Sequence, residues 1–443
     1  MSRARRPFFA RRRMAGLSLI EMMIALVMAL IVAAGIITVF ASTSSSNKVQ
    51  AQMAALQEEG RFAIQSLRSD LANANGAYCS NSGGNAGATS SGLYLDALRS
   101  PTIYAKAAIN FTDNTLTLPA PTQAYSLPSS IFMRGYDCTT TACTPVDPNT
   151  TVPAIPPMGP LVGNRVLGAD VLTIRYLKPG SGWAISPSGG TPGSTITAAS
   201  DGTVSSITLS PLTGTEAPAS DFTGTFAMLA DCSNAQVFAV TDASGVLTPT
   251  GANYASPLDI SKGAAPRVFD FTNDFQTITY YLKVVCANGT PPCSGTKTGE
   301  LERRINGVDQ PLVRGVERLD FRYGIINANG DTQFLTANEV DTGVTTGGAS
   351  IPCPPGVSID GGMGSAGCLW RAVQTIEVHI LMDGQTPLYT LTPAETYYVY
   401  TPDGAIKPTA PSAHTVTPAS QGFPNQVLRR EFTTVVALRN FNP

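Results

Sequence analysis

The chain begins with a basic segment that is followed at once by a long apolar run, and this pair of segments constrains the fold most. Six arginines and no acidic residue lie within residues 1–16. Residues 17–41 contain only three polar side chains, Ser18, Glu21 and Thr38. A helix of that length spans about 37 Å, enough to cross a hydrocarbon layer of roughly 30 Å with some tilt. The chain is therefore expected to be held in a membrane by one N-terminal helix.

The charges on either side of the run orient this helix. The arginines precede it, and the first charge after it is Lys48. Positive residues stay on the cytoplasmic side, so the N-terminus is predicted to be cytoplasmic and the remainder exported. A cleaved secretory signal is an alternative, because small residues at 33–35 and 41–43 are typical of its cleavage sites. The run is long for such a signal, however, and it contains Glu21, whose carboxylate is costly in hydrocarbon.

Residues 16–21, Gly-Leu-Ser-Leu-Ile-Glu, resemble the class III signal of type IV prepilins and type II secretion pseudopilins. In those proteins a dedicated peptidase cuts after the glycine, and the new N-terminus is methylated. The resemblance implies cleavage between Gly16 and Leu17, N-methylation of Leu17, where most relatives have Phe, and an assembly role for Glu21. The new ammonium group of one subunit would pair with Glu21 of a neighbour, because an unpaired carboxylate is costly in an apolar filament core.

The helix is expected to continue beyond the membrane. No proline occurs between Pro7 and Pro101, and apolar residues recur at steps of three and four from Val49 to Leu71. This spacing predicts an amphipathic helix. A helix from Leu17 to about residue 73 would be roughly 85 Å long, with its second half packed on a globular head.

Strand signals dominate the rest of the chain. We predict strands at 171–177, 227–230, 237–241, 277–285, 316–323, 372–382, 397–400 and 432–439. Residues 80–165 are rich in Ser, Gly, Thr, Pro and Asn and are predicted to be long loops with occasional short strands. Residues 178–202 are predicted to be another loop, and residues 287–299 and 326–368 are predicted to be turn-rich. The fold class is therefore α+β, with one long helix against an antiparallel sheet. Four segments are expected: a leader (1–16), a transmembrane and filament-core helix (17–41), its amphipathic continuation (42–75) and a periplasmic head (76–443).

Five further segments are similar to PilW-family minor pilins of the type IV pilus. They are residues 57–62, 170–173, 230–241, 313–324 and 429–440. The resemblance implies a minor pilin that takes part in pilus assembly and initiation. Its implied partners are the prepilin peptidase, the assembly platform, other minor pilins, the major pilin and a PilY-type tip adhesin. A head of this size would obstruct packing along a filament shaft, which favours a place in a tip complex.

Eight cysteines in an exported head predict four disulfides, because that compartment is oxidising. Short spacings favour the pairs Cys138–Cys143, Cys286–Cys293 and Cys353–Cys368, which leaves Cys79 with Cys232. Eight cysteines can pair in 105 ways, so the sequence does not fix the connectivity. Free buried thiols are the alternative.

Signals for catalysis or metal binding are weak. The chain has only two histidines, a net charge of -2 and 14% charged residues, which gives no field for nucleic acid. Residues 362–367 match GxGxxG by letter, but they lie between a loop and a strand, which is the wrong context. His379 and Glu377 are interpreted as a surface pair, and Arg429 and Arg430 as edge-strand charges. Residues 327–331 and 360–362 are interpreted as turns and not as calcium loops. No catalytic residue, metal or cofactor is expected.

Two alternative functions remain open from the sequence. A minor pseudopilin of a type II secretion system would have the same N-terminal chemistry. A single-span anchored periplasmic enzyme or binding protein would keep Met1 and would have a concave site with convergent polar groups.

Overall fold

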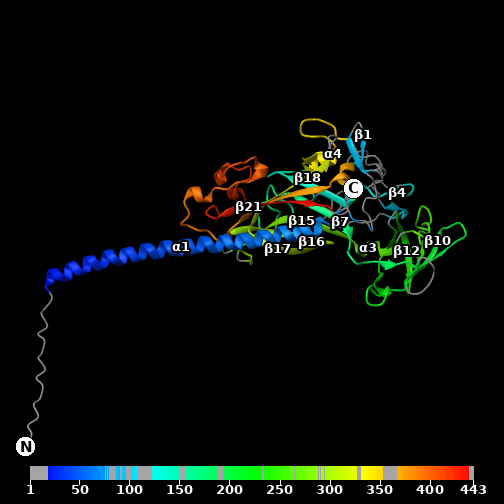
Figure 1. Cartoon of the computed structure of the whole chain (residues 1–443), viewed down its shortest axis with the longest axis horizontal. Coiled ribbons are helices and arrows are strands. Elements are labelled where there is room, and N and C mark those ends of the chain that lie inside the picture. The colour runs from blue at the N-terminus through cyan, green and yellow to red at the C-terminus, as the bar shows by residue number, and fades with distance from the viewer. Residues whose placement is uncertain are drawn as a thin grey trace, which may run out of the picture. The chain divides into compact units, whose positions relative to one another are not determined.

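The computed structural model describes most of the chain. The described residues are 18–74, 76, 78, 86–89, 92–95, 101–107, 122–149, 155–186, 193–231, 234–263, 265–287, 289, 291–293, 295–326, 331–352 and 367–438. They form one long helix and an antiparallel β-rich head (Figure 1). The predicted α+β class is confirmed. Two compact units divide the chain between Ala54 and Ala55.

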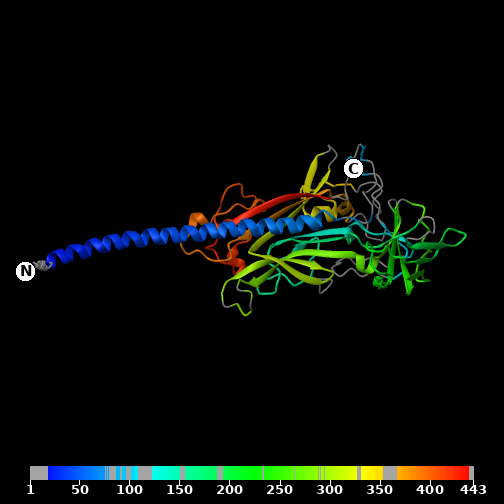
Figure 2. The same ribbon diagram turned by 60° about the horizontal axis from the view of Figure 1, so that its bottom comes forward.

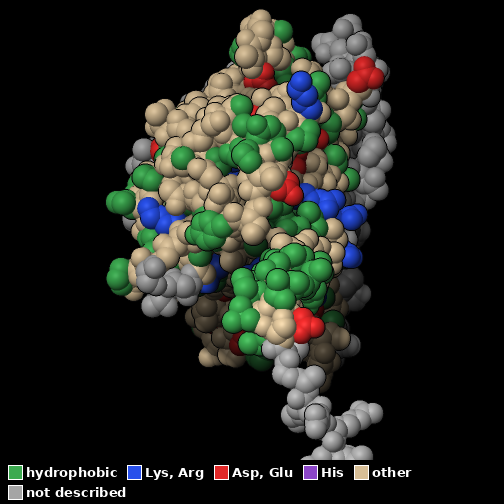
Figure 3. All heavy atoms as spheres, turned by 90° about the vertical axis from the view of Figure 1, so that its left-hand side faces the viewer, with side chains coloured by type: hydrophobic (Ala, Val, Ile, Leu, Met, Phe, Trp, Pro, Cys, Tyr) green, Lys and Arg blue, Asp and Glu red, His purple; other side chains and the backbone are tan. Residues whose placement is uncertain are grey.

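Helix α1 (Leu19–Leu71) is continuous over 53 residues. Its most apolar window of 18 residues has a mean hydropathy of 2.8, and none of that window is buried. Among the described residues it is the one helix long and apolar enough to cross a membrane. In Figure 3 the apolar side chains at the start of the helix gather into one green cluster. This part of α1 requires a lipid or protein environment, since so much contiguous apolar surface is not stable in water.

The last part of α1 is amphipathic. Its buried residues are Leu56, Gly60, Ala63, Leu67, Asp70 and Leu71. From Leu56 to Asp70 they are separated by steps of four, three, four and three, and Leu71 follows directly. That spacing places them on one face of the helix. Leu56 is 1% exposed, and Ala63, Leu67 and Leu71 are 0% exposed. The helix therefore packs on the head from Leu56 onward.

The face that α1 covers belongs to a six-stranded antiparallel sheet, with strand order β17-β16-β15-β7-β5-β6. Its strands are β5 (Met133–Cys138), β6 (Cys143–Thr144), β7 (Val171–Leu177), β15 (Phe275–Cys286), β16 (Lys297–Ile305) and β17 (Val308–Arg314). The central strand β15 is buried along most of its length because both of its faces are covered. Tyr280 faces α1 and bonds to Asp70, whereas Tyr281 packs with Tyr136 and Ile155 in a separate cluster.

A second antiparallel sheet, with strand order β19-β18-β20-β21, packs against the first. Its strands are β18 (Val316–Ile326), β19 (Thr332–Leu335), β20 (Thr375–Asp383) and β21 (Arg429–Ala437). The main-chain N–H of Asp170 donates to the carbonyl of Leu319 at 2.8 Å. A Cβ at Gly135 of β5 would overlap the hydroxyl of Tyr323 in β18, so only glycine permits this approach. Figure 2 shows β21, in red, running beside α1.

Residues 178–274 form a domain inserted between β7 and β15. It contains β8 (Trp183–Ala184), β9 (Thr195–Ala198), β10 (Val204–Thr208), β11 (Phe226–Ala230), β12 (Ala235–Ala243), β13 (Val246–Pro249) and β14 (Arg267–Asp270). Strands β3 (Thr102–Ile103) and β4 (Tyr125–Ser126) join the same sheet, β3 pairing with β12 in parallel. The domain has its own core, which includes Trp183, Ile207, Phe222, Phe238, Leu247 and Val268. A separate hairpin is made by β1 (Ala86–Thr89) and β2 (Gly92–Leu95).

The remaining elements are short helices. They are α2 (Ser129–Phe132), α3 (Phe271–Asp274), α4 (Ala337–Thr342), α5 (Pro418–Gln421), and the 3-10 helices η1 (Ala219–Asp221), η2 (Cys368–Ala372), η3 (Pro393–Thr396), η4 (Thr401–Asp403) and η5 (Pro411–Ala413). Residues 384–428, between β20 and β21, form an insertion that contains η3, η4, η5 and α5. The strand predicted at 397–400 is wrong, because Tyr398 makes only an isolated bridge to Thr409.

Candidate assembly site

The first turn of α1 is closed by a reciprocal pair of hydrogen bonds between Ser18 and Glu21. The main-chain N–H of Ser18 donates to a carboxylate oxygen of Glu21 at 3.1 Å, and the N–H of Glu21 donates to the Ser18 hydroxyl at 3.4 Å. This is a capping box, in which two unpaired N–H groups of a helix start are satisfied at once. The Ser-x-x-Glu spacing is typical of a capping box, but the prediction from the sequence gave Glu21 only an intermolecular role. Gly16 and Leu17 lie outside the described residues.

A buried ionic cluster holds the end of α1 on the six-stranded sheet. Asp70 accepts hydrogen bonds from Arg303 on β16, with Oδ2–Nε at 2.5 Å and Oδ1–Nη2 at 2.9 Å. It also accepts from the hydroxyls of Tyr176 at 2.9 Å and Tyr280 at 2.6 Å. Burial, together with the charge of Asp70, raises the pKa of both tyrosines, so both stay protonated and donate.

The pKa of the Arg303 guanidinium is raised as well. Burial alone would lower the pKa of Arg303, but its bonds to Asp70 outweigh burial and raise it. A carboxylate in the last turn of a helix is opposed by the helix dipole, so Asp70 depends on these partners. The cluster therefore fixes both the depth and the rotation of α1 on the sheet. Sequence reasoning missed it because its members are far apart in the chain.

Two further contacts join α1 to the end of the four-stranded sheet. Gly60 lies so close to the ring of Phe432 on β21 that a Cβ would be about 2.5 Å from ring carbons. Next to it, the side-chain amide of Gln385 donates to Glu59 at 3.0 Å. Burial raises the pKa of Glu59. Gly60 is thus a position of close packing.

The start of β21 contains a buried ion pair. Two guanidinium nitrogens of Arg429, Nε and Nη2, donate to Glu317 on β18, at 2.7 and 2.8 Å, and the Arg429 side chain is 0% exposed. Arg429 is therefore not the exposed edge charge that we predicted, because a partner on another strand neutralises it in the interior; Arg430 is exposed as expected. Burial and the adjacent Glu317 raise the pKa of Asp383 well above its ordinary value.

His379 is buried, which corrects the prediction of a surface pair. It lies 3.5 Å from Glu377, as the spacing suggested, but its Nδ1 is nearer to Glu431 of β21, at 2.8 Å. Burial would lower the pKa of His379, but the hydrogen bond to Glu431 and the carboxylate charges raise it. Glu431 also accepts from Thr401 of the 384–428 insertion, at 3.0 Å. The insertion covers this face and excludes water from His379.

The other histidine ties the same insertion together. His414 stacks on Tyr398 with ring centroids 3.9 Å apart, and its two nitrogens lie 3.0 Å from Asp403 and 3.0 Å from Thr409. Asp403 in turn pairs with Arg318 of β18 at 3.3 Å. The Asp-His-Thr order resembles a hydrolytic triad, but the His414 side chain is 1% exposed, so no substrate reaches it. The arrangement is structural: it holds residues 384–428 together and attaches them to β18.

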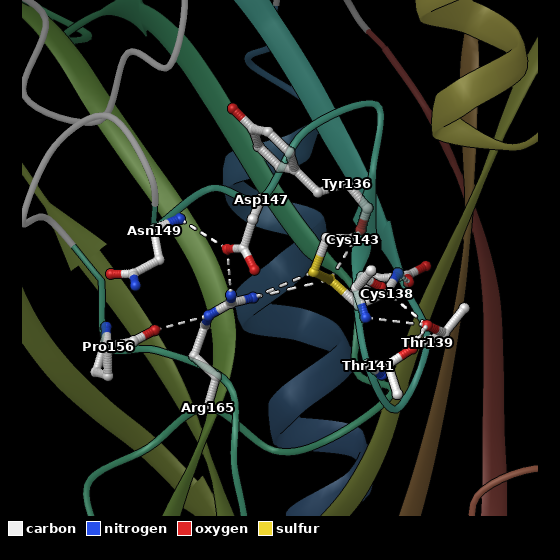
Figure 4. The surroundings of a disulfide bond; sticks show 11 residues. Tyr136, Cys138, Thr139, Thr141, Cys143, Asp147, Asn149, Pro156 and Arg165 are labelled. Carbon is white, nitrogen blue, oxygen red and sulfur yellow. Dashed lines mark hydrogen bonds and ion pairs between the residues drawn. A yellow bond between two sulfur atoms is a disulfide. The ribbon is translucent and has the colours of Figure 1, made fainter.

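Two of the expected disulfides are present in the structure, Cys138–Cys143 and Cys286–Cys293. Figure 4 shows the first of them beside the buried guanidinium of Arg165, which lies 3.6 Å from the Cys143 sulfur and 2.7 Å from Asp147. Cys368 is also disulfide-bonded. Cys79, Cys232 and Cys353 lie outside the described residues, as do residues 327–330 and 360–362 of the two Asx-rich turns. Among the described residues no cluster of three potential metal ligands occurs.

An apolar N-terminal helix with one acid in its first turn, attached to a β-rich head by its second half, is the architecture of a prepilin-type filament subunit. Residues 11–37 match the prokaryotic N-terminal methylation motif. Residues 280–440 match the model of the type IV pilus-assembly protein W, PilW. The two matches support the prediction of a PilW-like minor pilin of the type IV pilus that is involved in pilus assembly. No curated protein and no solved structure gives a significant match.

The PilW match covers most of the contacts that hold α1, but it does not cover Tyr176 on β7. Arg303, Gln385 and Phe432 fall within it, whereas the inserted domain of residues 178–274 falls outside both matches. The PilW family is a structural assembly family and is not known as an enzyme. The apolar helix and the methylation motif fit a single-pass anchor in the inner membrane. They also imply a prepilin peptidase site and contacts with other components of the pilus.

Proposed function

We propose that this chain is a tip subunit of the pilus, which initiates assembly and is not repeated along the shaft. Before assembly its N-terminus is cytoplasmic and its head is periplasmic. The peptidase cuts between Gly16 and Leu17, Leu17 is N-methylated, and Glu21 sets the register between helices. The four segments 1–16, 17–41, 42–75 and 76–443 then act as leader, filament-core helix, connecting helix and head.

The observation that carries the tip assignment is the position of the inserted domain beyond the C-terminal end of α1. Tyr78, just after the helix, packs edge-on against Phe269 of β14 with ring centroids 5.0 Å apart. Its hydroxyl donates to the carbonyl of Ala265 at 2.7 Å. In a filament whose helices point the same way, this end of a head faces the preceding subunit. A domain of nearly a hundred residues there obstructs that neighbour, unless the subunit is the first.

Labelling of intact pili tests the position. An epitope placed in the exposed β9–β10 turn at Gly202, which has open space around it, marks the inserted domain without disturbing its core. We expect gold label at one end of each filament and none along the shaft. Label spread along shafts would contradict the tip assignment, as would pili that lack the label while the membrane retains it.

N-terminal sequencing of the membrane-bound form tests the processing. A methylated Leu17 is expected. Retention of Met1, or a start after Ala41, would overturn the filament role and favour an anchored periplasmic protein or a secreted one. Deletion separates the two machines, because loss of twitching with normal protein secretion supports a pilus and the reverse supports type II secretion.

The proposed partners follow from this position. They are the prepilin peptidase, the assembly platform, the other minor pilins, the major pilin below the tip, and a PilY-type tip adhesin above it. The role is non-enzymatic, with no metal, cofactor or nucleic acid.

A further inference from the structure

Strand β21 forms the outer edge of the four-stranded sheet and has no partner on its far side among the described residues. It pairs only with β20, through nine consecutive residue pairs from Asp383↔Arg429 to Thr375↔Ala437 without a register shift. An edge of this kind presents a row of unpaired N–H and C=O groups to any extended chain that approaches it.

The hydrogen bonds at the two ends of β21 show which groups point outward. At one end the main-chain N–H of Leu438 donates to the carbonyl of Gln374. At the other end the N–H of Gly384 donates to the carbonyl of Leu428, so the main-chain N–H and C=O groups of the even-numbered residues of β21 point toward β20. In an antiparallel pair the hydrogen-bonding direction alternates from residue to residue. The main-chain N–H and C=O groups of the odd-numbered residues therefore point away from β20, toward the open edge. In β21 these are Arg429, Glu431, Thr433, Val435 and Ala437, of which the last three are exposed, with Val435 at 51%.

The other edges of the three larger sheets are blunted along their length, whereas β21 carries its exposed charge, Arg430, only near one end. Strand β17 contains Pro311, carries the charged Asp309 and Arg314, and pairs with β16 through a bulge. Strands β6, β8 and β4 have two residues each, β19 has four, and β9 has four with a bulge. Strand β21 has nine residues, no proline and no bulge, and residues 432–437 are uncharged. Soluble proteins block long regular edges, so one left open indicates a docking edge.

A second copy of this chain does not fit that edge. Figures 1 and 2 both show β21 advancing in the same direction as the second half of α1. Two copies paired through antiparallel β21 strands would have the second halves of their α1 helices pointing in opposite directions, which subunits of one polar filament cannot adopt. A parallel β21 pair would require two copies side by side, whereas the proposed tip position supplies one copy for each filament. The occupant therefore comes from a different chain.

The position of the edge also indicates which chain this is. Phe432 of β21 packs against Gly60 of α1, so the edge lies alongside the helix. Neighbours in a filament are brought alongside that helix by the packing of their own apolar N-terminal helices. We propose that the outer edge of β21 is a strand-addition site, which pairs with an extended segment of the head of another pilin-type subunit. This inference rests on the proposed filament role and names a neighbour's docking surface.

Site-specific photo-crosslinking in the full-length chain tests the inference. A photoreactive residue replaces Val435, and a matched one replaces Val308, which is 64% exposed on the blunted edge strand β17. From position 435 we expect one crosslinked partner, identified by mass spectrometry as a chain with a prepilin-type N-terminus, and from position 308 none. A crosslink to a second copy, to a non-pilin protein, or to nothing would overturn the inference.

Substitutions at the same position provide a second readout. Val435→Pro removes an outward N–H that the head does not use, and Val435→Lys adds a charge to the edge. We expect at least a fivefold loss of either variant from sheared pili at an unchanged membrane level, and no loss for Val308→Lys. If Val435→Pro does not accumulate, Val435→Lys decides, because it keeps every N–H. Normal incorporation of Val435→Lys would overturn the inference. If the wild type itself is absent from pili, the proposed function fails, and the membrane crosslink still decides on the edge.

Discussion

Asp70 at the end of α1 and Arg303 on β16 form a two-pronged, partly buried ion pair, with N–O distances of 2.5 and 2.9 Å. Their positions are 233 residues apart in the sequence. The pair joins the last turn of α1 to the six-stranded sheet.

Replacing Asp70 by Asn is expected to lower the free energy of unfolding by about 2 kcal/mol, because it removes the charge from the hydrogen bonds that Asp70 accepts from Arg303 and the two tyrosines. Both tryptophans, Trp183 and Trp370, are buried in the head, so their fluorescence reports its unfolding in the detergent-solubilised chain. Glu58→Gln, an exposed acid on the same helix, is the control and should change the free energy by less than about 0.5 kcal/mol. Equal stability of the two variants would contradict the anchoring role.

Gly60→Ala tests the close approach of α1 and β21. Alanine favours a helix over glycine by about 1 kcal/mol, yet the new Cβ would lie within about 2.5 Å of the Phe432 ring. We expect a net loss of about 1 kcal/mol, since overpacking a dense contact outweighs the propensity gain. The double variant Gly60→Ala/Phe432→Leu should recover stability. If Gly60→Ala alone is more stable than the wild type, the contact does not constrain the helix.

The sequence predicted α1 and the long strands well, because their periodicity is local. Strand β7 has the predicted bounds, and β11, β12, β15, β18 and β21 were each predicted to within three residues at either end. The predicted assembly residue Glu21 depends on a motif of six neighbouring residues, which is equally local. These elements are specified by residues within one or two turns or one strand.

Features that depend on distant partners could not be predicted in this way. Strands β16 and β17 were missed because Glu300, Glu302, Arg303 and Arg304 are typical of a surface segment, although Glu300 and Glu302 are buried beside Arg314 and Lys283. Short strands such as β10 and β14 are surrounded by Gly, Ser and Pro and give no periodic signal. The buried positions of Arg429 and His379 follow from Glu317 and from residues 384–428, which no spacing in the sequence brings together.

Stability should depend on pH through His379. Its pKa is raised in the folded protein by Glu431 and Glu377, against the effect of burial. The protonated form therefore stabilises the fold fully below the unfolded pKa of about 6.5, and this contribution is lost as the pH rises through the higher folded pKa. We expect the stability difference between the wild type and His379→Gln to be largest near pH 5.5 and to fade above neutral pH. Asp383 and Glu59 also have raised pKa values, but their contributions to the pH dependence are the same in both proteins and cancel in this difference. A difference independent of pH would show that His379 does not titrate as described.

Cysteine pairing is tested by counting thiols. We expect no alkylation of the native protein and eight alkylated cysteines after reduction and denaturation. Replacing both Cys138 and Cys143 by Ala should cost about 2 kcal/mol, the value expected for closing a loop of this length. Any thiol alkylated in the native chain would contradict four disulfides, and peptide mapping would then show which cysteine carries it.

Glu21 has two possible partners, and its variants separate them. Within one chain its carboxylate caps the helix through Ser18, whereas in a filament it would pair with the ammonium group of a neighbour's Leu17. Glutamine keeps the capping box but carries no charge, and alanine removes both. If the charge sets register, Glu21→Gln and Glu21→Ala should both be processed normally and both be depleted from pili by tenfold or more, while Ser18→Ala is depleted little. Quantitative mass spectrometry of sheared pili against membranes measures this. Normal incorporation of Glu21→Gln would limit Glu21 to capping its own helix, and the register would then have to come from the apolar surface of α1 alone.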